Sequence, residues 1–166
     1  CLQLQRNRVS GLTRRYDIVI LLETHGNEGN HLTLRSRLPF WGSHMTLHAS
    51  PTAGGVIILV HPDLVGRFSA VSQHVIEPGR ALVLDFQHPT FGLRVAAVHC
   101  DCRHRPAQRR SLWRSMGSWR TPPQEGLLVL IGDLNTVAQG DYRFYPLTGA
   151  FSHPIDHLEE VMNEEI

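Results

Sequence analysis

The sequence predicts an α/β domain with a mixed sheet, and three features carry this prediction. Short apolar runs at 17–23 and 127–131 have the length and composition of buried strands. Between them, strand-like segments recur about every 12 residues with short turns, which is typical of an antiparallel meander. The stretch after Pro106 has the apolar periodicity of an amphipathic helix. Together these features argue against a wholly parallel sheet of the dinucleotide-binding type.

Length and composition restrict the class of protein. The 166 residues suffice for one domain with a sizeable core, so we expect a single domain over 1–166. Hydrophobic content is 42% and charged content 19%, as in ordinary globular proteins. No apolar run approaches the ~20 residues that span a bilayer. Residues 1–16 lack the apolar centre of a signal peptide, so we expect an intracellular protein without a membrane segment.

The charged residues and the cysteines further restrict the class of protein. The net charge is only +1, but all 16 basic residues are arginine. Arginine binds phosphate through two parallel hydrogen bonds, which suits a phosphate-handling protein; codon bias is the competing explanation. Three cysteines are too few for a disulfide framework. The segment Cys100-Asp-Cys-Arg-His104 lacks a second ligand pair, so zinc is disfavoured.

The first part of the chain predicts short strands separated by loops and weak helices. Residues 2–15 are weakly helical, and the strand at 17–23 ends in Glu23-Thr-His-Gly. A Gly- and Asn-rich loop then leads to a short helix or loop. The expected segments are a helix or loop at 31–37, a strand at 38–48 and a strand at 56–61 that follows Gly54-Gly55.

The second part of the chain predicts the meander, one clear helix and a last buried strand. In the segment 81–87, alternate positions are apolar, which places Leu82, Leu84 and Phe86 on one face. The expected segments are a turn after Pro62, a poor strand at 67–76, strands at 81–87 and 93–99, a helix from Pro106 to Thr121-Pro-Pro, a strand at 127–132, a loop at 136–153 and a helix from Pro154 to Ile166.

The predicted helix after Pro106 has two different faces. Its apolar stripe is typical of packing against a sheet, and comprises Leu112, Trp113, Met116 and Trp119. The opposite face is basic, and comprises Arg109, Arg110, Arg114 and Arg120. This basic face is either a solvated surface or a surface that contacts nucleic-acid phosphates.

Polar side chains follow three of the predicted strands at the point where each ends. Glu23 ends one apolar run, His99 ends another, and Asp133 with Asn135 ends a third. Positions i and i+2 of a strand point to the same side, so Asp133 and Asn135 can face one reacting group. A carboxylate binds Mg²⁺ or orients water, and a histidine donates a proton or binds a phosphoryl oxygen. The set predicts a phosphoesterase site.

Five segments in a fixed order resemble the endonuclease/exonuclease/phosphatase superfamily, which includes abasic-site endonucleases, DNase I and the endonuclease domains of non-LTR retrotransposons. The Glu-Thr-His and Gly-Asp-x-Asn-x-Val forms are most similar to the retrotransposon branch. The segments are Asp-Ile-Val-Ile-Leu-Leu-Glu-Thr-His at 17–25, Gly-Gly-Val-Ile-Ile-Leu-Val at 54–60, Gly-Arg-Ala-Leu-Val-Leu at 79–84, Val-Ala-Ala-Val-His at 95–99 and Ile-Gly-Asp-Leu-Asn-Thr-Val at 131–137.

The resemblance implies a fold and a reaction. The fold is a four-layer α/β/β/α sandwich, DNase I-like, with two packed mixed sheets. The reaction is Mg²⁺- or Mn²⁺-dependent hydrolysis of a phosphodiester, with DNA as the substrate. By position, Glu23 corresponds to the metal ligand, and Asp133 and Asn135 to the pair that orients water and contacts the phosphate. His99 corresponds to a general acid or phosphate-binding histidine.

The same resemblance also marks departures from the family pattern. We expect the family's first strand, with its metal-binding Asn, to precede residue 1, and the closing Asp-His pair to follow residue 166. The pair Asp156-His157 lies too soon after Asn135 and in a predicted helix, so we do not assign it that role. Ala97 stands where many members carry Asn. The expectation is therefore a domain truncated at both ends.

Three functions follow from this sequence. The first is the DNA endonuclease of a retrotransposon-like polyprotein, nuclear and with a reverse transcriptase downstream. The second is a small-molecule phosphatase of the same fold, acting on inositol phosphates or phospholipid head groups. The third is a catalytically inactive remnant of the domain, with sheet edges exposed where missing strands would pair.

Overall fold

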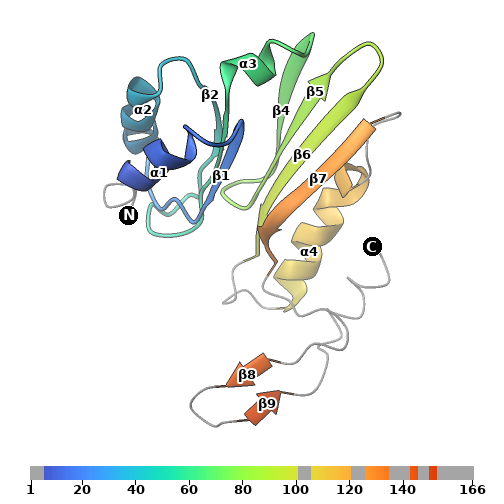
Figure 1. Cartoon of the computed structure of the whole chain (residues 1–166). Coiled ribbons are helices and arrows are strands. Elements are labelled where there is room, and N and C mark those ends of the chain that lie inside the picture. Colours follow the sequence, from blue (N-terminus) through green and yellow to red (C-terminus); the bar gives the residue numbers. More distant parts are fainter. Residues whose placement is uncertain (1–5, 101–105, 121–125, 135–142, 146–149, 153–166) are drawn as a thin grey trace.

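The computed structural model describes residues 6–100, 106–120, 126–134, 143–145 and 150–152 of the chain (Figure 1). Their elements follow the order α1 (Arg6–Leu12), β1 (Ile18–Leu22), α2 (Glu28–Arg37), β2 (Gly42–Thr46), β3 (Val56–Val60), α3 (Pro62–Val65), β4 (Ala70–Glu77), β5 (Ala81–Gln87), β6 (Gly92–His99), α4 (Pro106–Met116), a 3-10 turn η1 (Gly117–Arg120), β7 (Gly126–Asp133), β8 (Arg143–Tyr145) and β9 (Ala150–Ser152).

Two sheets make up the centre of the described structure. The first has the order β1-β3-β2 with antiparallel pairs, and its middle strand β3 is buried at every position. The second has the order β4-β5-β6-β7, antiparallel between β4, β5 and β6. Strand β7 then pairs parallel to β6, with α4 as the crossover between them. In the described residues the second sheet is therefore mixed, as expected from the sequence, and the first sheet is antiparallel.

The two sheets pack face to face around one apolar core. Three alternate residues of β3 contact the face of β5 and β6 that the alternation in sequence predicts. Continuous burial of these β-branched and leucine side chains is what holds the sheets together. The fully buried members of this core are Val56, Ile58, Val60, Leu82, Leu84, Phe86, Val95 and Ala97.

Helices cover the outer face of each sheet (Figure 1). Val9 of α1 and Leu34 of α2 pack with Val19, Ile57 and Leu59 on the outside of the first sheet. Outside the second sheet, the apolar stripe of α4 covers β5 and β6, through Leu112 and Met116. The layers are thus α/β/β/α, and the predicted four-layer fold is confirmed.

Several predictions about local structure need correction. The predicted antiparallel meander is confirmed for β4, β5 and β6, but β3 belongs to the other sheet. The expected turn after Pro62 contains the short helix α3, begun by the His61 ring accepting the Asp63 N–H. The expected loop at 136–153 contains the pair β8 and β9. The predicted helix from Pro154 lies outside the described residues.

The helix after Pro106 also differs from its prediction. It ends as an α-helix at Met116, and the chain continues as the 3-10 turn η1. Trp119 of η1 packs on His74 and under the guanidinium of Arg94, 4.8 Å from the ring centre. Arg109 is buried and does not belong to the solvent face. Within the part of the chain that the structure describes, no helix is long and apolar enough to cross a bilayer.

Candidate functional site

The strand ends that carry polar side chains meet at one edge of the sandwich. The carboxyl end of β1 lies beside the start of β3, because the N–H groups of Thr24 and His25 donate to the carbonyls of Gly55 and Gly54. The carboxyl end of β6 lies beside the start of β5, since the His99 N–H donates to the Arg80 carbonyl. The two pairs of strands belong to different sheets, so the edge lies between them.

The chain turns sharply just after β1. Glu23 and His25 both have positive φ, at 52° and 41°, a region that side chains other than glycine seldom occupy. Opposite them, Gly55 has φ 94° and approaches so closely that a Cβ there would lie 2.3 Å from the Thr24 Oγ1. Strained backbone of this kind persists only where surrounding contacts fix it, and it is frequent at functional sites.

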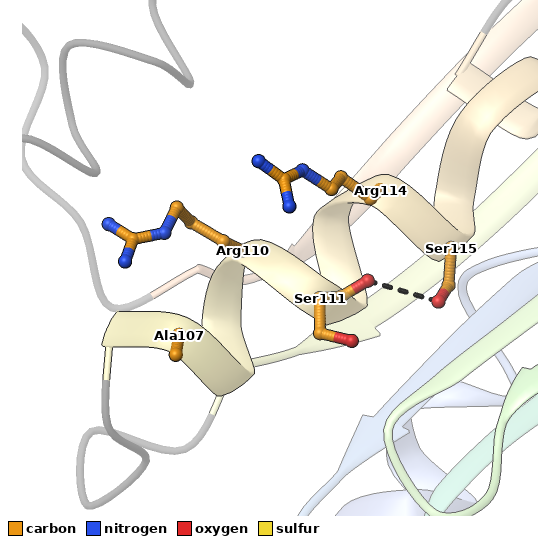
Figure 2. Close-up of a pocket in the computed structure, with 5 residues that line it drawn as sticks. All are labelled: Ala107, Arg110, Ser111, Arg114 and Ser115. Carbon is orange, nitrogen blue, oxygen red and sulfur yellow. Dashed lines mark hydrogen bonds between the residues drawn. The ribbon is translucent and has the colours of Figure 1, made fainter.

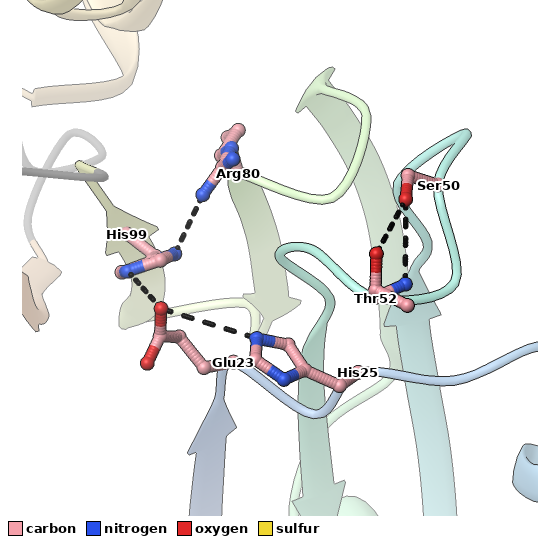
Figure 3. A network of polar contacts seen from close by, with 6 residues as sticks. All are labelled: Glu23, His25, Ser50, Thr52, Arg80 and His99. Atoms are coloured by element: carbon pink, nitrogen blue, oxygen red, sulfur yellow. Dashed lines mark hydrogen bonds and ion pairs between the residues drawn. The ribbon is translucent and has the colours of Figure 1, made fainter. Parts of the chain in front are cut away.

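A chain of polar contacts crosses from one sheet to the other (Figure 3). The Arg80 Nη1 donates to the His99 Nδ1 at 2.9 Å, and the His99 Nε2 lies 3.3 Å from the Glu23 Oε1. The same carboxylate oxygen lies 4.0 Å from the His25 Nε2. Arg80 and His99 are buried, at 4% and 2% exposure, while the Glu23 side chain is 50% exposed. This row of contacts therefore leads from the buried guanidinium of Arg80 to the solvent-accessible carboxylate of Glu23.

Asp133 ends β7 next to this chain. It is paired in register with His99 on the neighbouring strand, and its carbonyl accepts the Cys100 N–H at 2.7 Å. Its side chain is exposed. Gly132 makes this pairing possible, because a Cβ at that position would lie 2.0 Å from the Val98 carbonyl oxygen. Glu23, His99 and Asp133 are thus on neighbouring strand ends, as the sequence predicts, and Asn135 lies outside the described residues.

Cys100 lies at the end of β6 below this edge, and its thiol is unreactive. Burial, and secondarily the Asp133 carboxylate, raise the pKa of the Cys100 thiol to about 11, against the opposing effect of Arg109 and Arg80. The thiol therefore stays protonated near neutral pH and is a poor nucleophile or metal ligand. Cys102 and His104 of the disfavoured zinc segment lie outside the described residues.

Arg80 is the site residue that sequence reasoning missed. The segment Glu77-Pro-Gly-Arg80 has the composition of a turn, and it does turn: Gly79 has φ 69° and the Arg80 N–H donates to the Glu77 carbonyl. The missed signal was a lone arginine at the start of an otherwise apolar strand, in the resembling segment 79–84. A buried guanidinium needs acceptors, and here one of them is His99.

The outer face of α4 forms a depression that runs along most of the helix (Figure 2). It is lined by Ala107, Arg110, Ser111, Arg114 and Ser115. The guanidinium groups of Arg110 and Arg114 extend to the same side of the helix (Figure 2). The helix has no acidic residue, and the neighbouring Arg109 acts electrostatically on Cys100 at the end of β6. This basic surface therefore lies near the polar strand ends.

Comparison with known proteins identifies the class. The profile of the endonuclease/exonuclease/phosphatase family matches residues 2–158, and the chain belongs to this family. No curated protein matches the sequence.

Solved structures share the fold at low sequence identity. D. rerio TDP2 with a single-strand DNA product is 16% identical with a TM-score of 0.58, covering 80% of this chain and 53% of that one. ANGEL2, a 2′,3′-cyclic phosphatase, is 16% identical with a TM-score of 0.55, covering 81% and 44%. Beta toxin from Staphylococcus aureus is 16% identical with a TM-score of 0.52, covering 85% and 61%. The chain spans about half the length of these structures.

Proposed function

We propose that this chain is a metal-dependent phosphodiesterase domain that cleaves DNA. One observation carries the proposal: His99 from one sheet contacts Glu23 from the other, at 3.3 Å, on the edge where Asp133 also ends its strand. In a member of this family, an acidic and a histidine side chain at neighbouring strand ends form a site suited to a phosphoryl group.

Each residue has a proposed role. Glu23 holds Mg²⁺, with Mn²⁺ as the other candidate, because its carboxylate is half exposed at the edge. Asp133 orients the attacking water, and His99 and Asn135 hold the phosphate. The metal, when bound, supplies positive charge to the phosphoryl oxygens and to the leaving oxygen.

The described residues fit a metal that is held loosely. Among them, no group of three or more His, Cys, Asp and Glu side chains is arranged to hold a metal. Mg²⁺ commonly binds through one or two carboxylates and completes its coordination with water and substrate phosphate. Glu23 supports that kind of binding and not an all-protein cage. Because the described residues offer no more than this to a metal, a catalytically inactive domain is the alternative to the proposed enzyme.

The basic face of α4 favours DNA over a small phosphate ester. Arg110 and Arg114 are one helical turn apart, close to the spacing of neighbouring phosphates along a strand. A head group or inositol phosphate that fits at the strand ends has no need of this outer surface. A host retrotransposon-like polyprotein, with a nuclear site of action and a reverse transcriptase in the same chain, is proposed only from the Glu-Thr-His and Gly-Asp-x-Asn-x-Val segments.

A plasmid-nicking assay tests the proposal. We expect the chain to convert supercoiled plasmid to open circles with Mg²⁺, and expect Glu23→Ala and Asp133→Ala to remove this activity. Asp63→Ala is the matched control, because Asp63 is an exposed carboxylate in the helix that follows the opposite end of β3. Nicking that survives both site substitutions would refute the assignment. No nicking, together with release of phosphate from inositol phosphates, would favour the phosphatase, and neither activity would favour the inactive form.

A further inference from the structure

We propose that Arg80 is a positioning residue that fixes the tautomer of His99, with the ring proton on Nε2. The tautomer itself follows from the geometry alone. Its chemical meaning rests on the proposed function: His99 then acts as a hydrogen-bond donor to a phosphoryl oxygen, and not as the acid that protonates the leaving group.

Arg80 holds His99 through two separate contacts. The Arg80 carbonyl accepts the His99 backbone N–H at 2.8 Å, which fixes where β6 ends. The Arg80 Nη1 lies 2.9 Å from the His99 Nδ1, which fixes the ring. Both side chains are almost completely buried, so water does not compete for either contact.

The chemistry of arginine decides the direction of the side-chain contact. A guanidinium has only N–H donors and stays charged, so the His99 Nδ1 must be the acceptor. A neutral imidazole that accepts at Nδ1 carries its proton on Nε2. The Nε2 faces the Glu23 Oε1 at 3.3 Å, and a carboxylate oxygen is an acceptor. Two independent contacts thus require the same tautomer.

Any other arrangement of protons on the His99 ring would point two N–H donors, or two acceptors, at each other. A proton on Nδ1 alone would direct an N–H at the Arg80 N–H and a nitrogen lone pair at the Glu23 carboxylate. A ring carrying both protons would keep the first of these conflicts. Because an acid that gives up a proton completely needs that doubly protonated ring, Arg80 favours a donor that shares its proton and keeps it.

The position of Arg80 is itself fixed by the turn before β5. The Gly79 N–H donates to the Thr46 Oγ1 at 2.9 Å, and the Gly79 carbonyl accepts the Gly55 N–H at 2.9 Å. The turn is therefore attached to β2 and to the start of β3. A long side chain that starts from such a fixed backbone is well suited to orient a second side chain.

Nitrogen-15 NMR of the unaltered chain, without metal or substrate, tests the proposal directly. We expect the His99 Nδ1 to show the shift of an unprotonated nitrogen and the Nε2 that of a protonated one, with His99→Gln used to assign the signals. Signals of the opposite tautomer, or signals averaged between both, would overturn the proposal. This result does not depend on nicking, so it is distinguishable from failure of the proposed function.

Two variants and a control test the consequence for the reaction. We expect Arg80→Met to average the His99 ring signals and to lower kcat about 10–100-fold with little change in KM, since Arg80 acts through His99. Arg80→Lys keeps an N–H donor, so it should restore part of the tautomer preference of His99 and part of the kcat. The control is Arg94→Met, because Arg94 also starts from the second sheet but pairs with Asp85 at 2.7 Å. If Arg80→Met lowers kcat but leaves the His99 ring signals unchanged, Arg80 has a merely structural role. If Arg80→Met does not fold, the nitrogen-15 spectrum of the unaltered chain decides whether the proposed tautomer is present.

Discussion

Substitution of Gly132 tests whether the end of β7 is positioned by close contact with β6. A Cβ at this position would lie 2.0 Å from the Val98 carbonyl oxygen and 2.9 Å from its carbon. Real contacts of this kind stay above 3.0 Å, so the two strands must separate by about 1 Å. Because the obstacle is backbone, no side-chain rotation relieves it.

The size of the effect follows from what the separation disrupts. Overpacking typically costs about 1–3 kcal/mol, and the neighbouring hydrogen bond from the Cys100 N–H to the Asp133 carbonyl contributes about 0.5–1.5 kcal/mol. We therefore expect Gly132→Ala to lower the free energy of unfolding by about 2–4 kcal/mol. Asp133 moves with the strand, and a displacement near 1 Å can reduce the rate about 100-fold.

Urea unfolding of Gly132→Ala and Gly11→Ala provides the comparison. At Gly11, in α1, nothing lies within 4 Å of an added Cβ, so alanine should be neutral or stabilise the chain by up to about 1 kcal/mol. The two substitutions add the same methyl group and should differ in sign. If Gly132→Ala unfolds within about 0.5 kcal/mol of the unaltered chain, the close contact does not position β7.

Two further predictions concern charge. Replacing both Arg110 and Arg114 by glutamine should weaken the salt dependence of binding to duplex DNA, measured in EDTA. The slope of log binding constant against log salt concentration should become smaller by about 1.8, because each lost phosphate contact contributes about 0.9. The control is Arg67→Gln at an exposed position, which should leave the slope unchanged; an equal change of slope in the control and in the double variant would contradict a phosphate contact at α4. Burial, and secondarily Arg35, lower the pKa of His31, and burial lowers that of His44. The unfolded chain then binds more protons in acid, so stability should fall as the pH drops below the ordinary histidine pKa of 6.5. The double variant His31→Gln, His44→Gln should show a smaller fall in urea unfolding at a series of pH values. An equal fall in the unaltered chain and in the variant would contradict this prediction.

The strands were predictable where burial dominates. The strand predicted at 81–87 has the same bounds in the structure, because it is buried on both faces, one against the other sheet and one against α4. The parallel return of β7 was not predictable from spacing, since it depends on a crossover helix and not on a turn. Arg109 was assigned to the wrong face: it precedes Trp113 by one helical turn and Met116 by two, so helical periodicity places it on the apolar stripe, and there it is buried.

For the candidate site, the sequence predicted which strand ends carry polar side chains, but not the contacts between those side chains. Glu23, His99 and Asp133 were identified because each ends an apolar run, and strand ends gather at sheet edges. That Glu23 and His99 come from different sheets depends on how the sheets stack, which no local pattern records. Arg80 was missed because its partner is a side chain on the neighbouring strand, and cross-strand register is fixed by pairing.

The order of the groups in the Arg80–His99–Glu23 chain matters for the proposed metal. If the guanidinium paired with Glu23 directly, two opposite charges would neutralise each other at the edge. Instead the ring of His99 lies between them: its Nδ1 accepts from Arg80, and in the proposed tautomer its Nε2–H faces the carboxylate. The Glu23 side chain is half exposed at this edge, so its carboxylate is accessible to a divalent cation. The arrangement therefore uses the buried cation to orient a donor while leaving the carboxylate available to the metal.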